Sequence, residues 1–184
     1  MKFLDRFLQN WRIAKVRKFI PPGARILDIG SADGALFAAL GKSVGSGSLG
    51  MDPTLKQPLT VNNCALVPGY FPDAVPQNTE PFDVVTMLAV LEHFPAAAYE
   101  TLRVGCERLL KPGGKVLITV PSPQVDHILA VLTFLRLADG MSLEEHHGFN
   151  VEQTKDIFPR PQFRLVEHSC FQLGLNNLFV FERT

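Results

Sequence analysis

Apolar residues recur along the chain at two spacings, one typical of helices and the other of buried strands. Helical spacing covers residues 3–20, 35–40, 95–110 and 124–138, and a short helical segment follows at 151–158. Short apolar runs fit strands at residues 25–29, 48–51, 64–67, 82–88 and 115–120. Two last runs, 163–173 and 178–182, flank residues 174–177, a turn rich in glycine and asparagine. This order predicts an α/β fold, a doubly wound sheet whose last pair of strands is antiparallel.

The segment 25–40 has the order strand, tight turn, helix. Gly30 and Gly34 permit positive φ and leave room for a ligand to approach the backbone. Asp33 is expected to cap the helix, whose free N–H groups and positive dipole end then face the turn. Such a turn suits a carboxylate or a phosphate.

Three turns are predicted to share one edge of the sheet. Asp28 stands at the end of the first strand, Asp52 ends the second, and Gly69 follows the third. Ligands of doubly wound sheets bind beyond the carboxyl ends of the strands. A carboxylate about 20 residues after the glycine turn is placed to accept hydrogen bonds from both ribose hydroxyls. Asp52 is therefore interpreted as a nucleoside-binding residue.

Length and composition fit one globular domain over residues 1–184, with an N-terminal helix in 1–20 and a core in 24–184. Eighteen basic residues balance eighteen acidic ones, so no overall field attracts nucleic acid. The three cysteines lack the spacing of a metal site and suggest reduced thiols in a cytoplasmic protein. The most apolar run, residues 128–135, is far shorter than the roughly 20 residues that span a membrane.

The N-terminal helix is amphipathic. Its apolar positions include Phe7, Leu8 and Trp11, and basic residues stand mostly between them. We expect a basic outer face and an apolar face packed on the edge of the domain. The alternative is peripheral contact of residues 1–20 with a membrane surface or an anionic partner.

The glycine turn is a poor dinucleotide fingerprint, because Ala32 and Ala35 replace two of its glycines. The pattern Asp28-x-Gly30-x-Ala32-x-Gly34 resembles instead the first motif of class I S-adenosylmethionine-dependent methyltransferases. Residues 50–53, 82–94 and 109–114 resemble later motifs of that family, in the same order, and the resemblance covers roughly 24–182. Segments 91–93 and 146–149 are most similar to the small-molecule branch related to quinone-biosynthesis enzymes.

The resemblance implies a Rossmann-like, doubly wound, seven-stranded sheet with strand 7 antiparallel and helices on both faces. It also implies S-adenosylmethionine as cofactor, with S-adenosylhomocysteine as product. Asp28 would orient the methionine ammonium, and Asp52 would bind the ribose. Gly30 and Ser31 would line the methionine end, while Pro53, Tyr70 and Phe71 would wall the adenine and Leu88 would touch the cofactor from below. The expected cofactor-binding residues are Asp28, Gly30, Ser31, Ala32, Gly34, Asp52, Pro53, Gly69, Tyr70, Phe71 and Leu88. Ala32 stands where relatives often have glycine, so we expect a modestly weakened affinity.

The implied reaction is direct in-line transfer of a methyl group, for which the protein supplies alignment and proton removal. His93 is the first candidate base, with Glu92, His146 and His147 behind it. A metal held by the adjacent pair His146 and His147 is disfavoured, because adjacent side chains seldom converge on one ion. No metal site is therefore expected.

The acceptor is expected to be a small or lipid-like molecule methylated on oxygen, nitrogen or carbon. The apolar segment 125–138 and the basic N-terminal helix motivate a lipid-like acceptor. Nucleic acid substrates are disfavoured, since residues 87–90 do not resemble Asn/Asp-Pro-Pro-Tyr and the chain has no Pro-Cys pair. One alternative stays open, a cofactor-binding interaction module without catalysis. An NAD-dependent oxidoreductase is disfavoured by Ala32 and Ala35. The acceptor, the methylated atom, the use of a base and the oligomeric state are not determined by the sequence.

Overall fold

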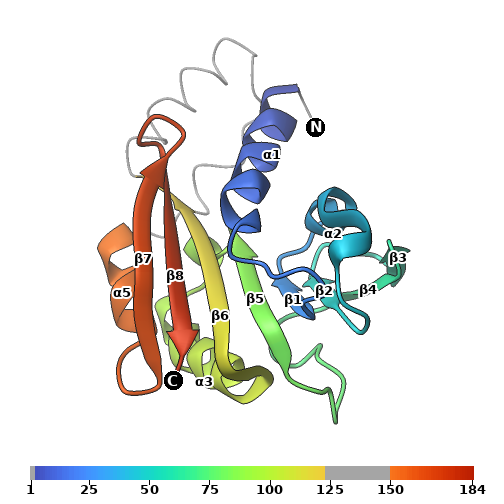
Figure 1. The fold of residues 1–184 in the computed structure, drawn as a ribbon. Helices are drawn as coiled ribbons and strands as arrows, with labels where there is room; N and C mark the ends of the chain where they lie inside the picture. Colours follow the sequence, from blue (N-terminus) through green and yellow to red (C-terminus); the bar gives the residue numbers. More distant parts are fainter. Residues whose placement is uncertain (1–2, 123–149) are drawn as a thin grey trace.

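A computed structural model describes residues 3–122 and 150–184, and its centre is one mixed sheet (Figure 1). The eight strands lie in the order β3-β4-β2-β1-β5-β6-β8-β7. Their bounds are β1 Ile26–Ile29, β2 Leu49–Asp52, β3 Leu59–Val61, β4 Cys64–Pro68, β5 Phe82–Leu88, β6 Leu110–Pro121, β7 Phe163–Phe171 and β8 Asn176–Arg183. The α-helices are α1 Phe3–Arg17, α2 Ala35–Leu40, α3 Tyr99–Leu109 and α5 Thr154–Ile157. Single 3-10 turns are η1 Gly41–Ser43, η2 Leu91–His93, η3 Ala96–Ala98 and η5 Val151–Gln153.

Strand directions confirm the Rossmann-like, doubly wound α/β fold. Strands β4, β2, β1, β5 and β6 are parallel, and the last strand, β8, runs antiparallel to both β6 and β7. The sheet has eight strands rather than seven, because the short β3 pairs antiparallel with β4. Asn62 and Asn63 both take positive φ between these strands, a conformation that asparagine tolerates well. Residues 59–68 therefore form an edge hairpin.

Helices cover both faces of the sheet, as expected (Figure 1). Side chains of one strand alternate between two cores, because successive residues point to opposite faces. In β8, Leu178 and Val180 pack with α1 and α2, whereas Phe179 and Phe181 pack on the face that carries α3 and α5. Burial on both faces explains why the central strands read as continuous apolar runs.

The N-terminal helix does not bury the side that the sequence pattern predicts. Ile13 and Val16 form its buried side, at 4% and 0% exposure. Phe7 and Trp11, which were expected to face the domain, are 49% and 38% exposed. The apolar pattern gave the wrong buried side, because the helix buries aliphatic residues of its second half and leaves the aromatic residues of its first half exposed.

Two further expectations need correction. The last turn comprises residues 172–175, not 174–177, because Asn176 and Asn177 are buried in β8 and Asn177 Nδ2 donates to Ser122 Oγ (2.9 Å). The helix expected over 95–110 divides into η3 and α3, while that at 151–158 is confirmed as η5 and α5. The apolar helix expected over 124–138 lies outside the described residues.

Candidate functional site

The glycine turn after β1 is held against the end of β2. Backbone N–H groups of Gly30 and Ser31 both donate to the carbonyl of Met51, at 2.8 and 3.0 Å. Gly30 and Gly34 have φ of 76° and 77°, where a side chain is strained. A Cβ on Gly30 would stand 2.3 Å from Val90, which follows β5. The turn therefore needs glycine there both for conformation and for space.

Asp33 does not cap the helix, which corrects the sequence prediction. Gly34 is the N-cap of α2, in a left-handed conformation, and as a glycine it has no side chain to bond the free N–H groups. Asp33 is exposed to solvent. Helix α2 also has only six residues, so its dipole is short.

Asp52, at the end of β2, closes the same turn from the side. Its Oδ2 accepts from the backbone N–H of Ala32 at 2.9 Å, and its Oδ1 accepts from the N–H and hydroxyl of Thr54 at 2.8 and 2.5 Å. Ala32 has φ of 44°, a conformation that this hydrogen bond helps to hold. A carboxylate has about four acceptor positions, so one stays available to a ligand hydroxyl.

Asp28 is the buried carboxyl group of the site, at 4% exposure in β1. Thr86 of the neighbouring β5 donates its hydroxyl to Asp28 Oδ1 at 2.6 Å. Burial raises the pKa of Asp28 to about 7, and the negative charge of Asp52 raises it too, against the lowering by Thr86. The pair Asp28 and Asp52 thus makes the turn favourable for a cation and for hydroxyl donors.

Other expected cofactor residues lie in different surroundings. The Ser31 hydroxyl is buried over Gly50 and has no partner within the described residues. Leu88 is half-buried at the end of β5, and Pro53 is exposed beside Asp52. Gly69 donates its N–H to the Asp52 carbonyl at 3.3 Å, which ties the β4 turn to the same edge.

The side chains of Tyr70 and Phe71 differ in exposure. Tyr70 is 74% exposed after β4, whereas Phe71 is in the core at 9%. The Phe71 ring packs so closely on α3 that a Cβ on Gly105 would meet it at 2.6 Å. The structure thus brings Tyr70 to the edge and places the Phe71 ring against α3.

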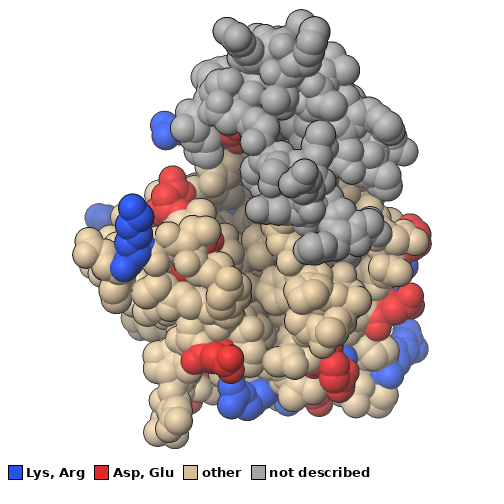
Figure 2. All heavy atoms as spheres, turned by 180° about the vertical axis from the view of Figure 1, so that it is seen from behind, with Lys and Arg blue, Asp and Glu red and all other residues tan. Residues whose placement is uncertain are grey.

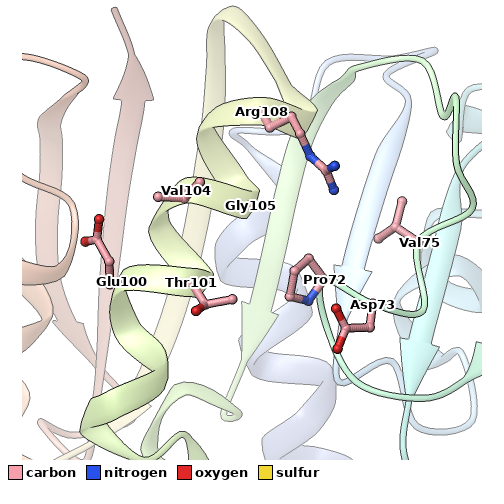
Figure 3. Close-up of a pocket in the computed structure, with 8 residues that line it drawn as sticks. All are labelled: Pro72, Asp73, Val75, Glu100, Thr101, Val104, Gly105 and Arg108. Atoms are coloured by element: carbon pink, nitrogen blue, oxygen red, sulfur yellow. The ribbon is translucent and has the colours of Figure 1, made fainter.

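A groove that sequence reasoning missed lies between the segment after β4 and α3 (Figure 3). It measures about 510 Å³, and Figure 3 shows Arg108 on the α3 side of the groove and Asp73 on the side of the segment after β4. The complete lining is Pro72, Asp73, Val75, Glu100, Thr101, Val104, Gly105 and Arg108. No local motif could reveal the groove, because it forms where two distant segments meet.

Two catalytic candidates follow β5 directly, on η2. Glu92 is 3% exposed, and its Oε2 has no hydrogen-bond partner within residues 3–122 and 150–184. Burial raises the pKa of Glu92 to about 7, while its own backbone N–H and the positive charge of Arg12 on α1 lower it. His93 is half-buried, and His146 and His147 lie outside the described residues.

Within the described ranges, no three His, Cys, Asp or Glu side chains are grouped to hold a metal ion. Over the same ranges, no helix has the length and apolar character needed to cross a membrane.

Comparison with known sequences gives concordant matches. The model of a family described as a methyltransferase domain matches residues 2–168. A ubiquinone biosynthesis O-methyltransferase of Aliivibrio fischeri is 35% identical over 162 residues, covering 82% of this chain and 64% of that protein. One from Vibrio cholerae is 30% identical over 161 residues, covering 82% and 62%. The chain thus spans somewhat less than two thirds of these relatives.

Solved structures share the fold at low sequence identity. The magnesium protoporphyrin IX methyltransferase of Synechocystis PCC 6803, with bound SAH, has a TM-score of 0.64 at 13% identity, covering 97% of this chain and 83% of that one. A methyltransferase from Mesorhizobium loti has a TM-score of 0.65 at 17% identity, covering 92% and 96%.

Proposed function

Because the chain belongs to the methyltransferase-domain family, we propose that it transfers a methyl group from S-adenosylmethionine to a small or lipid-like acceptor. The observation that carries this proposal is that Asp28 and Asp52, on adjacent parallel strands, flank one glycine turn. Two such carboxyl groups can bind a positively charged ammonium group and the hydroxyl groups of a ribose, whereas they would repel the negative charge of a pyrophosphate. The neighbour solved with bound SAH supports the same cofactor.

Each residue around the turn has a proposed task toward this cofactor. Asp28 binds the ammonium group in its ionised form, so it releases its proton on binding. Asp52 keeps its bonds to Ala32 and Thr54 and accepts from the ribose. Tyr70, through its exposed ring, and Pro53 border the adenine.

When bound, the cofactor supplies a methyl group on a sulfonium, whose leaving group is a neutral thioether. The acceptor must therefore lose a proton as the new bond to its methyl group forms. We assign that proton to Glu92 Oε2, the buried oxygen that has no partner within the described residues. Burial raises the pKa of Glu92 to about 7, against the lowering by Arg12, so Glu92 can accept a proton near neutral pH. His93, His146 and His147 are the alternative bases.

The name of the relatives, ubiquinone biosynthesis O-methyltransferase, favours a small-molecule acceptor with an oxygen nucleophile. A nucleic acid acceptor is disfavoured by the net charge, because eighteen basic residues balance eighteen acidic ones. On the face in Figure 2, the described Lys and Arg residues stand beside Asp and Glu residues and form no patch of one sign. The buried free thiols of Cys64 and Cys106 suit a reducing cytoplasm.

Transfer of labelled methyl groups tests the proposal. The protein is incubated with methyl-labelled S-adenosylmethionine and a bacterial metabolite and lipid extract, and products are separated by chromatography. We expect at least one labelled small product, formed about 100-fold more slowly when Glu92→Gln replaces the wild type. Cofactor binding without any labelled product would favour the non-catalytic interaction module, and binding of NADH in its place would favour an oxidoreductase.

A further inference from the structure

The outer face of α1 carries aromatic side chains where a surface helix normally carries polar ones. Phe7 and Trp11 are four residues apart and therefore adjacent, with ring centroids 5.6 Å apart at 70°. They lie opposite the side of the helix that buries Val16, which is 0% exposed. Within the described residues these rings pack on each other and remain 49% and 38% exposed.

A third exposed apolar residue lies beside this helix. Leu173, in the turn between β7 and β8, is 94% exposed, the largest value among the described large apolar side chains. Its φ is 59°, a conformation that costs a leucine about 1 kcal/mol relative to glycine. The neighbouring Gln172 donates from Nε2 to the Leu8 carbonyl at 2.9 Å and so fixes the turn to α1. At 94% exposure, the Leu173 side chain is not part of the core formed by the described residues.

The helix that carries Phe7 and Trp11 is also rich in basic residues. Residues 3–18 contain five basic side chains and one acidic side chain, and one of the five, Arg12, is partly buried with its charge acting on Glu92. Arg6 and Arg17 are exposed and make no ion pair in the part of the chain that the structure describes. Lys18 pairs with Glu167 at 3.3 Å, but an exposed ion pair contributes little free energy, so Lys18 can leave it for an anionic headgroup.

We propose that Phe7, Trp11 and Leu173, here called the α1–hairpin surface, dock on an anionic phospholipid bilayer. The three side chains project from a helix and a turn, which suits insertion between lipid headgroups. The exposed basic residues of the same helix, Arg6 and Arg17, complement anionic headgroups. Helix α1 and the turn that joins β7 to β8, which carry these residues, both lie in the upper part of the view in Figure 1.

Docking would also orient the candidate site. Ser122, directly after β6, bonds to the same turn, since its N–H donates to Leu175 and its hydroxyl donates to Gly174 at 3.0 and 2.7 Å. The turn therefore lies at the carboxyl edge of the parallel strands, where the glycine turn lies. If the proposed function holds, this edge would face the bilayer and receive a lipid-like acceptor from it.

Trp11 is the only tryptophan of the chain, so its fluorescence reports on this surface directly. The full chain is titrated, without cofactor, with vesicles of phosphatidylcholine containing phosphatidylglycerol, and with vesicles of phosphatidylcholine alone. We expect a blue shift of the emission and quenching by brominated lipid with the anionic vesicles, both reduced at high salt. No methyl transfer is involved, so failure here is distinguishable from failure of the proposed function.

Variants then locate the contact while Trp11 is retained as the probe. Phe7→Ser combined with Leu173→Ser should weaken vesicle partition about tenfold or more, because each removes an apolar side chain from the interface. Val104→Ser, at a site on α3 that is 48% exposed, is the matched control and should partition like the wild type. Circular dichroism confirms that all variants fold.

An unchanged emission with anionic vesicles would overturn the proposal, as would equal partition of the double variant and the wild type. A blue shift that depends on protein concentration and needs no vesicles would also overturn it, because a second copy of the chain would then cover the surface.

Discussion

The backbone N–H of Ala32 donates to Asp52 Oδ2 at 2.9 Å, which joins the glycine turn to the end of the neighbouring strand. Ala32 was the least expected residue of the turn, since relatives often have glycine there. The structure gives it φ of 44°, so the position does use a conformation that glycine prefers. This backbone hydrogen bond therefore fixes the orientation of the Asp52 carboxylate, to which we assign binding of the ribose.

Ala32→Gly should raise the free energy of unfolding slightly, by about 0.5–1 kcal/mol. Relief of the left-handed strain of alanine outweighs the greater freedom of glycine in the unfolded chain. Urea denaturation measures the change. A destabilised variant would mean that the alanine methyl group makes contacts worth more than the strain.

Gly30→Ala should destabilise the protein by about 2–3 kcal/mol more than Gly23→Ala does, because overpacking adds to backbone strain. Both glycines have φ of 76°, but a Cβ meets Val90 at position 30 and open space at position 23. Thermal unfolding of the two variants isolates the clash. Equal losses would show that Val90 moves aside freely, and Gly30→Ala with Val90→Ala should recover part of the loss.

Asp28 predicts a pH dependence of cofactor binding. Its pKa of about 7 means that the carboxyl group is largely protonated at pH 5.5 and must ionise to bind an ammonium group. Affinity should therefore rise between pH 5.5 and 7, approaching tenfold per pH unit well below the pKa. Calorimetry of S-adenosylhomocysteine binding measures it. Asp28→Asn should bind weakly with a flat profile, and a wild type as flat as this variant would contradict the role.

Glu92 predicts a pH dependence of stability. Its pKa rises from 4.5 to about 7 on folding, so the folded state holds the proton more tightly than the unfolded chain. Its favourable contribution is complete below pH 4.5 and is lost as the pH rises toward 7, by up to about 3 kcal/mol. Glu92→Gln cannot ionise, so it should match the wild type near pH 4.5 and exceed its stability at pH 8.

The same variant should lose methyl transfer by about 100-fold, the usual range for a lost general base. Denaturant unfolding at the two pH values and single-turnover assays give both readouts. A stabilised Glu92→Gln with full activity would restrict Glu92 to a structural role and return the base to His93, His146 or His147.

Local patterns predicted the sheet well, because buried parallel strands and glycine turns leave signals within a few residues. The pairs Asp28 with Gly30 and Asp52 with Pro53 could be found in this way. Contacts between distant segments could not. Which side of α1 is buried depends on its packing against the sheet. The Phe71 ring occupies the space left by the missing side chain of Gly105. The groove lined by Asp73 and Arg108 forms only when the segment after β4 packs near α3. The edge strand β3 was not predicted at all, and it forms because Asn62 and Asn63 allow a tight reversal before β4.

The most direct test of the central claim is calorimetric titration of S-adenosylhomocysteine into the wild type, Asp52→Ala and Asp33→Ala. Asp33 is an exposed acid of the same turn and controls for the lost charge. We predict saturable binding to the wild type and to Asp33→Ala, and at least about tenfold weaker binding to Asp52→Ala, since hydrogen bonds to a charged group are worth about 1.5–3 kcal/mol. Absence of binding by the wild type, or equal affinity for all three proteins, would contradict the account.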